Sequence, residues 1–219
     1  LDDKSIVGGK TEVDIIEKNI GEDVLKNQDK ENSDEENSDE ENSDAQIIER
    51  YPSGKPYNAR SLLLAGIQDV TEVLGSGNYK LESLIMLILE IYYNSLGFNF
   101  IALCLRDSKL NCYRARSVLG SNSLKYQNEI NVPTTESNDL FHLALKKNVD
   151  LLISDAHIPK IGKIIPTWHK ELFPKVQSFM ILPLVTNNKT IGFLYANRES
   201  TAPEGITTEE TKLIKLLKG

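Results

Sequence analysis

The sequence predicts an α+β protein whose centre is an antiparallel β-sheet. Two pairs of apolar runs, rich in β-branched and aromatic residues, are each joined by a short polar turn, as in β-hairpins. These runs are residues 98–105 with 110–118, and residues 180–185 with 190–195. Helical patterns stand at both ends of this region and in its middle. Strands joined by short turns pair antiparallel, and helices segregated from them form separate layers.

Two helices are expected before the first strand. The first has apolar residues at helical spacing and glycines at its end, at Leu63, Ile67, Val70, Leu74, Gly75 and Gly77. The second, over residues 81–96, is apolar on nearly all sides, so it must be covered from two directions. We expect its own sheet to cover one side. Another helix, such as one from a second copy of the chain, would cover the side with Met86, Leu89 and Tyr93, which makes a homodimer the expected assembly.

The elements after the first hairpin are shorter. Residues 129–132 are strand-like, and Asn138 or Ser137 can cap a helix that runs to residue 147. Its apolar side should be buried, while the two lysines at its end suit the negative end of the helix dipole. Residues 151–153 then form a buried strand.

The last part of the chain contains two further helices and the second hairpin. Pro166 is a good first residue for a short helix to residue 172. The hairpin turn at residues 186–189 holds two asparagines, which tolerate positive φ, and Gly192 in the second strand indicates a close backbone approach or a bulge. Thr207 and Glu210 have the spacing of a capping box for the closing helix.

The N-terminal region differs in composition from the rest of the chain. Residues 1–50 hold 17 acidic and 6 basic side chains, whereas residues 51–219 hold 15 acidic and 19 basic ones. Three near-copies of the pentapeptide Lys/Glu-Glu-Asn-Ser-Asp fill residues 30–44 without one apolar side chain. Such a segment cannot bury enough surface to offset its chain entropy, so we expect residues 27–46 to be a solvated, disordered linker. Its charge would repel phosphates, so nucleic acid is not an expected partner.

No membrane segment or export signal is expected. The sequence lacks an apolar run long enough to span a bilayer, and its N-terminus lacks the charged and then apolar pattern of a signal peptide. The expected protein is therefore soluble and cytoplasmic, with no membrane partner. Its start at Leu1 and its end inside a predicted helix suggest a piece of a longer chain.

Several separated segments carry a family resemblance. They are residues 61–69 (SLLLAGIQD), 103–107 (LCLRD), 141–147 (FHLALKK) and 165–168 (IPTW). Together they resemble the GAF-like domain that follows the HDOD domain in bacterial signal-transduction proteins. The resemblance covers residues 58–219 and implies terminal helices on one face of the sheet and a middle helical segment on the other. The related PAS fold has less room for a long apolar helix before its first strand. Residues 1–57 would then be the end of the upstream HDOD module and the acidic linker.

Catalytic signatures are missing from the sequence. It contains no phosphate-binding loop, no nucleophile elbow, no zinc-protease motif and no paired Cys-x-x-Cys. Cys104 and Cys112 fall in predicted strands and should be buried free thiols. Asp155 and His157 fit an Asx turn better than a metal site with His169. We therefore expect no catalytic residue, no metal and no cofactor.

The resemblance also implies where a small molecule would bind. GAF domains that bind ligands hold them between the sheet and the middle segment, which here spans residues 138–173. Aromatic walls with a few polar groups are usual in such sites. The candidates for this pocket are Phe141, His142, Asp155, Trp168, His169 and Tyr195. The sequence patterns of cyclic-nucleotide-binding and bilin-attaching GAF domains are absent. The sequence therefore identifies no ligand, and it leaves open whether one binds.

Three classes of function stay open at this point. The favoured one is a regulatory or sensory module that dimerises and couples an unknown signal to an N-terminal HDOD domain. The second is a purely structural interaction domain with a filled core and no ligand. The third is a small redox enzyme, such as the methionine-sulfoxide reductases that share this fold, which would need reactive cysteines in exposed positions.

The composition of residues 27–46 leads to a test. Deleting them should leave the melting temperature of the remaining protein almost unchanged, because a polar, self-repelling segment contributes no buried surface. Thermal melts of the two proteins check this. Strong hydrogen-exchange protection within residues 27–46 would contradict it.

Overall fold

The computed structural model describes residues 48–135 and 137–219, and Ile48–Gly219 forms one compact unit. The predicted linker at residues 27–46 lies outside the described residues. The helices are α2 (Ala59–Ser76), α3 (Leu81–Leu96), α4 (Ser123–Glu129), α5 (Leu140–Lys147), α6 (Pro159–Ile164), α7 (Thr167–Leu172) and α8 (Thr208–Lys218). The strands are β1 (Phe100–Asp107), β2 (Cys112–Gly120), β3 (Asn131–Pro133), β4 (Leu151–Ile153), β5 (Ser178–Thr186) and β6 (Lys189–Arg198). Within the described ranges, no helix has the length and apolar composition needed to cross a bilayer.

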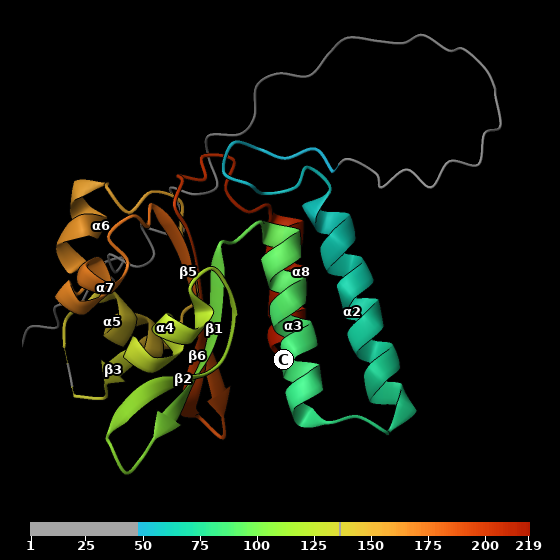
Figure 1. The fold of residues 1–219 in the computed structure, drawn as a ribbon, viewed down its shortest axis with the longest axis horizontal. Coiled ribbons are helices and arrows are strands. Elements are labelled where there is room, and N and C mark those ends of the chain that lie inside the picture. The colour runs from blue at the N-terminus through green and yellow to red at the C-terminus, as the bar shows by residue number, and fades with distance from the viewer. Residues whose placement is uncertain (1–47, 136) are drawn as a thin grey trace, which may run out of the picture. The chain divides into compact units, whose positions relative to one another are not determined.

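The strands form a six-stranded antiparallel sheet in the order β3-β2-β1-β6-β5-β4. Helices α2, α3 and α8 cover one face, and α4 to α7 lie on the other side (Figure 1). The predicted α+β fold, with terminal helices on one face and the middle segment on the other, is confirmed.

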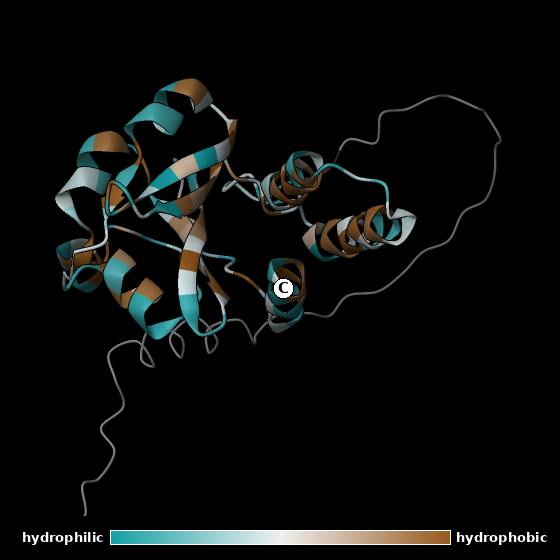
Figure 2. Cartoon of the chain, turned by 90° about the horizontal axis from the view of Figure 1, so that it is seen from below, coloured by the Kyte–Doolittle hydropathy of each residue, from teal (hydrophilic) through white to brown (hydrophobic). Residues whose placement is uncertain are grey.

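Helix α3 is buried from two sides by its own chain. Tyr92 is fully buried between the helix and the sheet, and its hydroxyl donates to the Ile214 carbonyl of α8 at 2.8 Å. On the other side, Gly66 of α2 lies so close to Ile91 that an added Cβ would approach its Cγ2 to 2.5 Å. Hydrophobic residues make up much of the helices of this layer, which Figure 2 shows nearly end-on. The second cover therefore comes from α2 and α8, and Leu89, expected at a dimer surface, is only 1% exposed.

Helices α2 and α8 begin at the same end of the unit. An ion pair joins Arg60, in the first turn of α2, to Glu209, in the first turn of α8. The predicted capping box opens α8, because the Glu210 N–H donates to the Thr207 hydroxyl at 3.2 Å and the Thr207 N–H donates to the Glu210 carboxylate at 2.8 Å. The two helices thus run parallel, with α3 antiparallel to both.

Asparagines set both hairpin turns. Asn187 and Asn188 have φ values of 49° and 59°, which confirms the predicted turn between β5 and β6. The first hairpin turns later than expected. Asn111, with φ of 50°, supplies the left-handed residue, whereas the expected turn was residues 106–109. Strand β1 therefore continues to Asp107, whose carboxylate accepts two backbone N–H bonds of the turn.

Two short helices were not expected from the sequence. Helix α4 buries none of its residues, and its Leu124 is 76% exposed, so it lacks the apolar periodicity that would reveal it. Helix α6 has only six residues, with Pro159 at its start and Gly162 inside it. Because α4 extends to Glu129, strand β3 starts at Asn131, two residues later than predicted.

Two helix starts differ from the prediction by one or two residues. The N-cap of α5 is Asp139, whose carboxylate accepts the His142 N–H at 3.0 Å, and the predicted caps Asn138 and Ser137 precede it. A carboxylate suits the positive end of a helix dipole better than an amide or a hydroxyl. Pro166 stands just before α7 as its N-cap, so this helix begins at Thr167.

The close approach predicted at Gly192 is present, and it can be tested. A Cβ on Gly192 would lie 2.2 Å from the Cys104 carbonyl oxygen of the neighbouring strand. Gly192→Val should therefore lower the free energy of unfolding by about 2–3 kcal/mol, because β1 and β6 must move apart. Urea denaturation measures this. Ile191→Val, at the exposed neighbouring position, is the control, and wild-type stability of the Gly192 variant would refute the strand packing.

Candidate functional site

Aromatic side chains fill the space between the sheet and the middle segment. Phe141 of α5 stands at their centre, with ring centroids 4.9 Å from Trp168, 5.4 Å from His169 and 5.9 Å from Tyr195. Phe141 is fully buried, and His169 and Tyr195 are 3% and 2% exposed. The rings of Phe100, Phe173, Phe179 and Phe193 belong to the same aromatic cluster, and those of Tyr113 and Tyr126 adjoin it.

The polar atoms of the aromatic cluster bond to one another. The Asn197 amide donates to the Tyr195 hydroxyl at 3.0 Å, and this hydroxyl lies 2.7 Å from His169 Nε2. Burial, and then the charge of Lys170, lowers the pKa of His169 to about 3, so the ring is neutral at physiological pH. Burial likewise raises the pKa of Tyr195 well above its usual value. The neutral imidazole and the neutral phenol share one hydrogen bond through His169 Nε2, so this nitrogen already has its partner inside the cluster.

The other two pocket candidates lie outside this cluster. His142 places Nδ1 2.7 Å from the Asp139 carboxylate and Nε2 2.8 Å from the Pro133 carbonyl, so it ties the start of α5 to the end of β3. Asp155 accepts the His157 N–H at 2.8 Å, which confirms the predicted Asx turn. Residues 48–135 and 137–219 contain no group of three His, Cys, Asp or Glu side chains placed to hold a metal ion.

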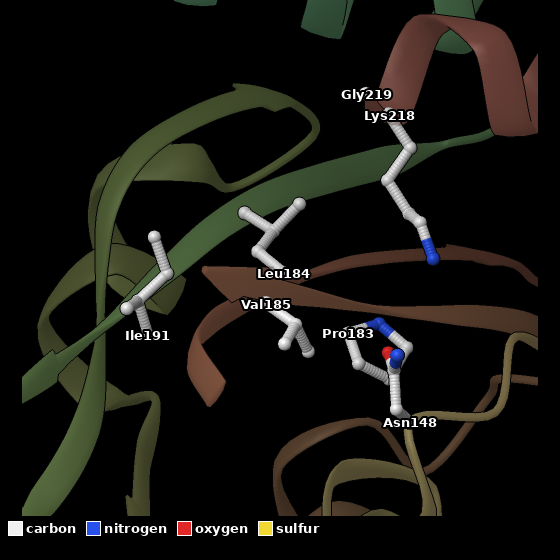
Figure 3. Close-up of a pocket in the computed structure, with 7 residues that line it drawn as sticks. All are labelled: Asn148, Pro183, Leu184, Val185, Ile191, Lys218 and Gly219. Carbon is white, nitrogen blue, oxygen red and sulfur yellow. The ribbon is translucent and has the colours of Figure 1, made fainter. Parts of the chain in front are cut away.

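An open groove of about 450 Å³ lies elsewhere, at the end of the β5–β6 hairpin. Its lining residues are Asn148, Pro183, Leu184, Val185, Ile191, Lys218 and Gly219 (Figure 3). Four of its lining residues, Pro183, Leu184, Val185 and Ile191, are apolar, and its one charged side chain, Lys218, already bonds the Asp150 carboxylate at 2.6 Å. None of the predicted pocket residues lines it.

The two cysteines are buried free thiols, as predicted. Cys104 is fully buried in β1, and Cys112 is 3% exposed at the start of β2. Burial raises the pKa of the Cys104 thiol, which disfavours the thiolate that a redox reaction needs.

A buried polar junction, which no sequence pattern predicts, lies at the end of the unit where α2 and α8 begin. Lys55 Nζ lies 2.7 Å from the Glu210 carboxylate, and both side chains are about 95% buried. The same ammonium donates to the Gly205 carbonyl at 2.9 Å. Ser53 adds a hydrogen bond to Glu204. These contacts join residues 53–55 to the start of α8 within the compact unit Ile48–Gly219.

The junction also holds the end of α3. Arg198, at the end of β6, is 4% exposed and donates to the Leu96 carbonyl at 3.1 Å, while its guanidinium lies 4.4 Å from the Phe98 ring centroid. Burial lowers the pKa of Arg198 to about 10, which still leaves it charged and suited to a helix C-terminus. Gly97 is needed because a Cβ there would lie 2.1 Å from the Gly54 carbonyl oxygen. The loop at residues 53–55 therefore crosses directly over the end of α3.

The exposed apolar side chains of the helical layer are not those predicted for the dimer surface. Met86 and Tyr93 are half-buried and pack against the core. Leu64 on α2 and Leu216 on α8 are 51% and 64% exposed instead. Apolar residues are also exposed around the α2–α3 turn, at Leu74, Tyr79 and Leu81.

Comparison with known proteins supports the fold. A scan against family models and a search of curated proteins find no match. Among solved structures, a GAF domain of a phosphoenolpyruvate-protein phosphotransferase from Coxiella burnetii is similar, with 17% identity, a TM-score of 0.55, and 72% of this chain and 92% of that chain covered. A methyl-accepting chemotaxis protein segment covers 70% of this chain and 90% of its own, with 13% identity and a TM-score of 0.51.

A third similar structure is an enzyme. It is the free methionine-R-sulfoxide reductase from Neisseria meningitidis in complex with its substrate, with 14% identity, a TM-score of 0.51, and 73% of this chain and 86% of that chain covered. At such identities the likeness shows the fold alone, and the fold is GAF-like. The predicted GAF-like domain is therefore confirmed at the level of architecture.

The buried junction makes a measurable prediction. Lys55→Met should lower the free energy of unfolding by about 3 kcal/mol, because it leaves the Glu210 carboxylate buried without its partner. Adding Glu210→Gln should recover much of the loss, since glutamine keeps the capping contact without the charge. Denaturant titrations of both variants check this. The control is Arg60→Ala in the exposed Arg60–Glu209 pair, and an equal loss there would refute a special role for Lys55.

Proposed function

We propose that this chain is a regulatory GAF-like module of a bacterial signal-transduction protein, which dimerises and couples a signal to an N-terminal HDOD domain of the same chain. The observation that carries the proposal is the buried junction. It ties the segment that arrives from the N-terminal side to the start of α8 and the end of α3. A change in the position of that segment would therefore act directly on the helical layer. The chemotaxis segment of similar fold supports a signalling role.

A redox enzyme is the weaker alternative. A reductase of this fold would need a cysteine that forms a thiolate and meets its substrate. Cys104 is fully buried, and the pKa of its thiol is raised by that burial. Cys112 is 3% exposed and belongs to the same packed strands. Both positions favour a structural role, which supports a protein without enzymatic activity.

The signal is proposed to arrive through protein contacts. A small molecule in the predicted pocket would have to displace the ring of Phe141, which contacts Trp168, His169 and Tyr195 from the centre of the aromatic cluster. The hydroxyl and ring nitrogen that would orient a ligand already bond to each other. A filled interior thus favours a regulatory interaction module over a receptor for a small molecule, and it needs no cofactor.

The dimer is proposed to form through the outer sides of α2 and α8. Leu64 and Leu216 are large apolar side chains that the monomer leaves more than half exposed on these helices. The first turns of the two helices meet at the Arg60–Glu209 pair, so both helices begin at the same end of the unit. A two-fold pairing through them would bring two upstream domains to the same end of the assembly at fixed geometry.

This assembly can be tested by charge substitution. Leu64→Glu with Leu216→Glu should convert the homodimer into a folded monomer, because the paired surface would then bury uncompensated carboxylates. Sedimentation velocity and thermal melts measure both properties. Leu124→Glu, at a 76% exposed site on α4, is the control. A wild-type protein that stays monomeric at high micromolar concentration would refute the dimer.

A further inference from the structure

Positive charge gathers in one part of the unit. Residues 140–198 hold eight Lys or Arg and three Asp or Glu, whereas residues 48–139 hold nine of each kind. Residues 199–219 hold three lysines and four glutamates. The positive excess therefore belongs to the segment that lies mainly on the face of the sheet away from α2, α3 and α8 (Figure 1).

The excess is densest over α6, α7 and the loop that follows. Four exposed lysines occur there, at Lys160, Lys163, Lys170 and Lys175. Residues 156–177 contain one acidic side chain, Glu171, and none of the four lysines forms an ion pair with any described residue. We call residues 157–175 the lysine segment. Its positive field is not neutralised by the fold, and such fields attract and steer partners of opposite charge.

Apolar surface accompanies this charge. Ile158, just before α6, is 46% exposed, whereas Ile161 within α6 is buried. Lys160 and Lys163 are three residues apart on α6 and so lie on one side of it. Their aliphatic stems can extend the apolar surface around Ile158 while the ammonium groups stay in water.

We propose that the lysine segment is a docking surface for an acidic peptide segment of a partner protein. Carboxylates of an extended peptide would pair with the four ammonium groups, and an aliphatic side chain of the peptide would rest on Ile158. Exposed pairs of this kind are individually weak and screened by salt, so the contact should be reversible and fast to form. The surface is separate from the proposed dimer helices, and the inference stands even if the chain does not dimerise.

Two observations favour an acidic protein over a nucleic acid. No arginine occurs between Arg116 and Arg198, so the lysine segment lacks the planar fork that binds phosphates in pairs. Trp168 is half-buried with its ring edge-to-face on Phe141, and Phe173 is only 4% exposed, so neither large aromatic ring of the lysine segment offers a free face for base stacking.

The test uses the full chain and a fluorescent peptide of glutamates with one central leucine. Fluorescence anisotropy should report binding that weakens steeply as salt rises. Changing Lys160, Lys163, Lys170 and Lys175 together to Glu should lower the affinity about tenfold or more. The control set changes Lys80, Lys109, Lys212 and Lys215 to Glu, which alters the net charge equally at exposed sites outside the lysine segment.

Each outcome decides the proposal. An equal loss in the control set would show that net charge alone attracts the peptide, and it would overturn the docking surface. Tighter binding of single-stranded RNA or of anionic phospholipid vesicles than of the peptide would overturn the acidic-protein assignment. Lysine-to-glutamine changes at the same four positions repeat the test if the glutamate set unfolds. Peptide binding that persists in the Leu64→Glu, Leu216→Glu variant would separate this surface from the dimer.

Discussion

A buried charge needs its partner, and in this fold that requirement fixes how the chain joins its helical layer. Lys55 precedes α2 and Glu210 lies in α8, yet their charged groups meet in one buried site. A lone charge there would cost several kcal/mol, so the loop and α8 must arrive together. Their meeting sets α2 beside α8, which then hold α3 against the sheet. Arg198 and Gly97 complete this geometry at the end of α3.

On the opposite face of the sheet, aromatic packing takes the place of a buried ion pair. There the interior is made of aromatic rings, and its few polar atoms satisfy one another through Tyr195, His169 and Asn197. A cavity in such a place would lose many small contacts at once, so the rings stay packed. The exterior of the same face carries the exposed lysines of the lysine segment. A sheet with a filled interior and two chemically different outer faces suits a protein that responds to neighbouring proteins.

The sequence was sufficient for those elements that local patterns determine. Apolar periodicity located α3, the asparagine turn located the β5–β6 hairpin, and the Thr207–Glu210 spacing located the start of α8. Helix α4 was not predicted, because none of its residues is buried and no apolar periodicity marks it. The buried junction was not predicted, because its partners, Lys55 and Glu210, are far apart in sequence and each alone looks like a surface residue. Of the pocket candidates, four share the aromatic cluster, while His142 and Asp155 make contacts outside it. The Asx turn at Asp155 was predicted from the sequence, whereas the bond of His142 to the Pro133 carbonyl was not.

The strand order also decides when this domain can become stable during its synthesis. The two central strands, β1 and β6, pair Phe100 with Asn197, so the middle of the sheet joins parts of the chain that are made far apart in time. Until β6 leaves the ribosome, α3 and the β1–β2 hairpin have half a core and an open strand edge. Such non-local pairing slows folding and exposes apolar surface to other chains. Nascent molecules of this protein should therefore depend on chaperones until their last strand and helix are complete.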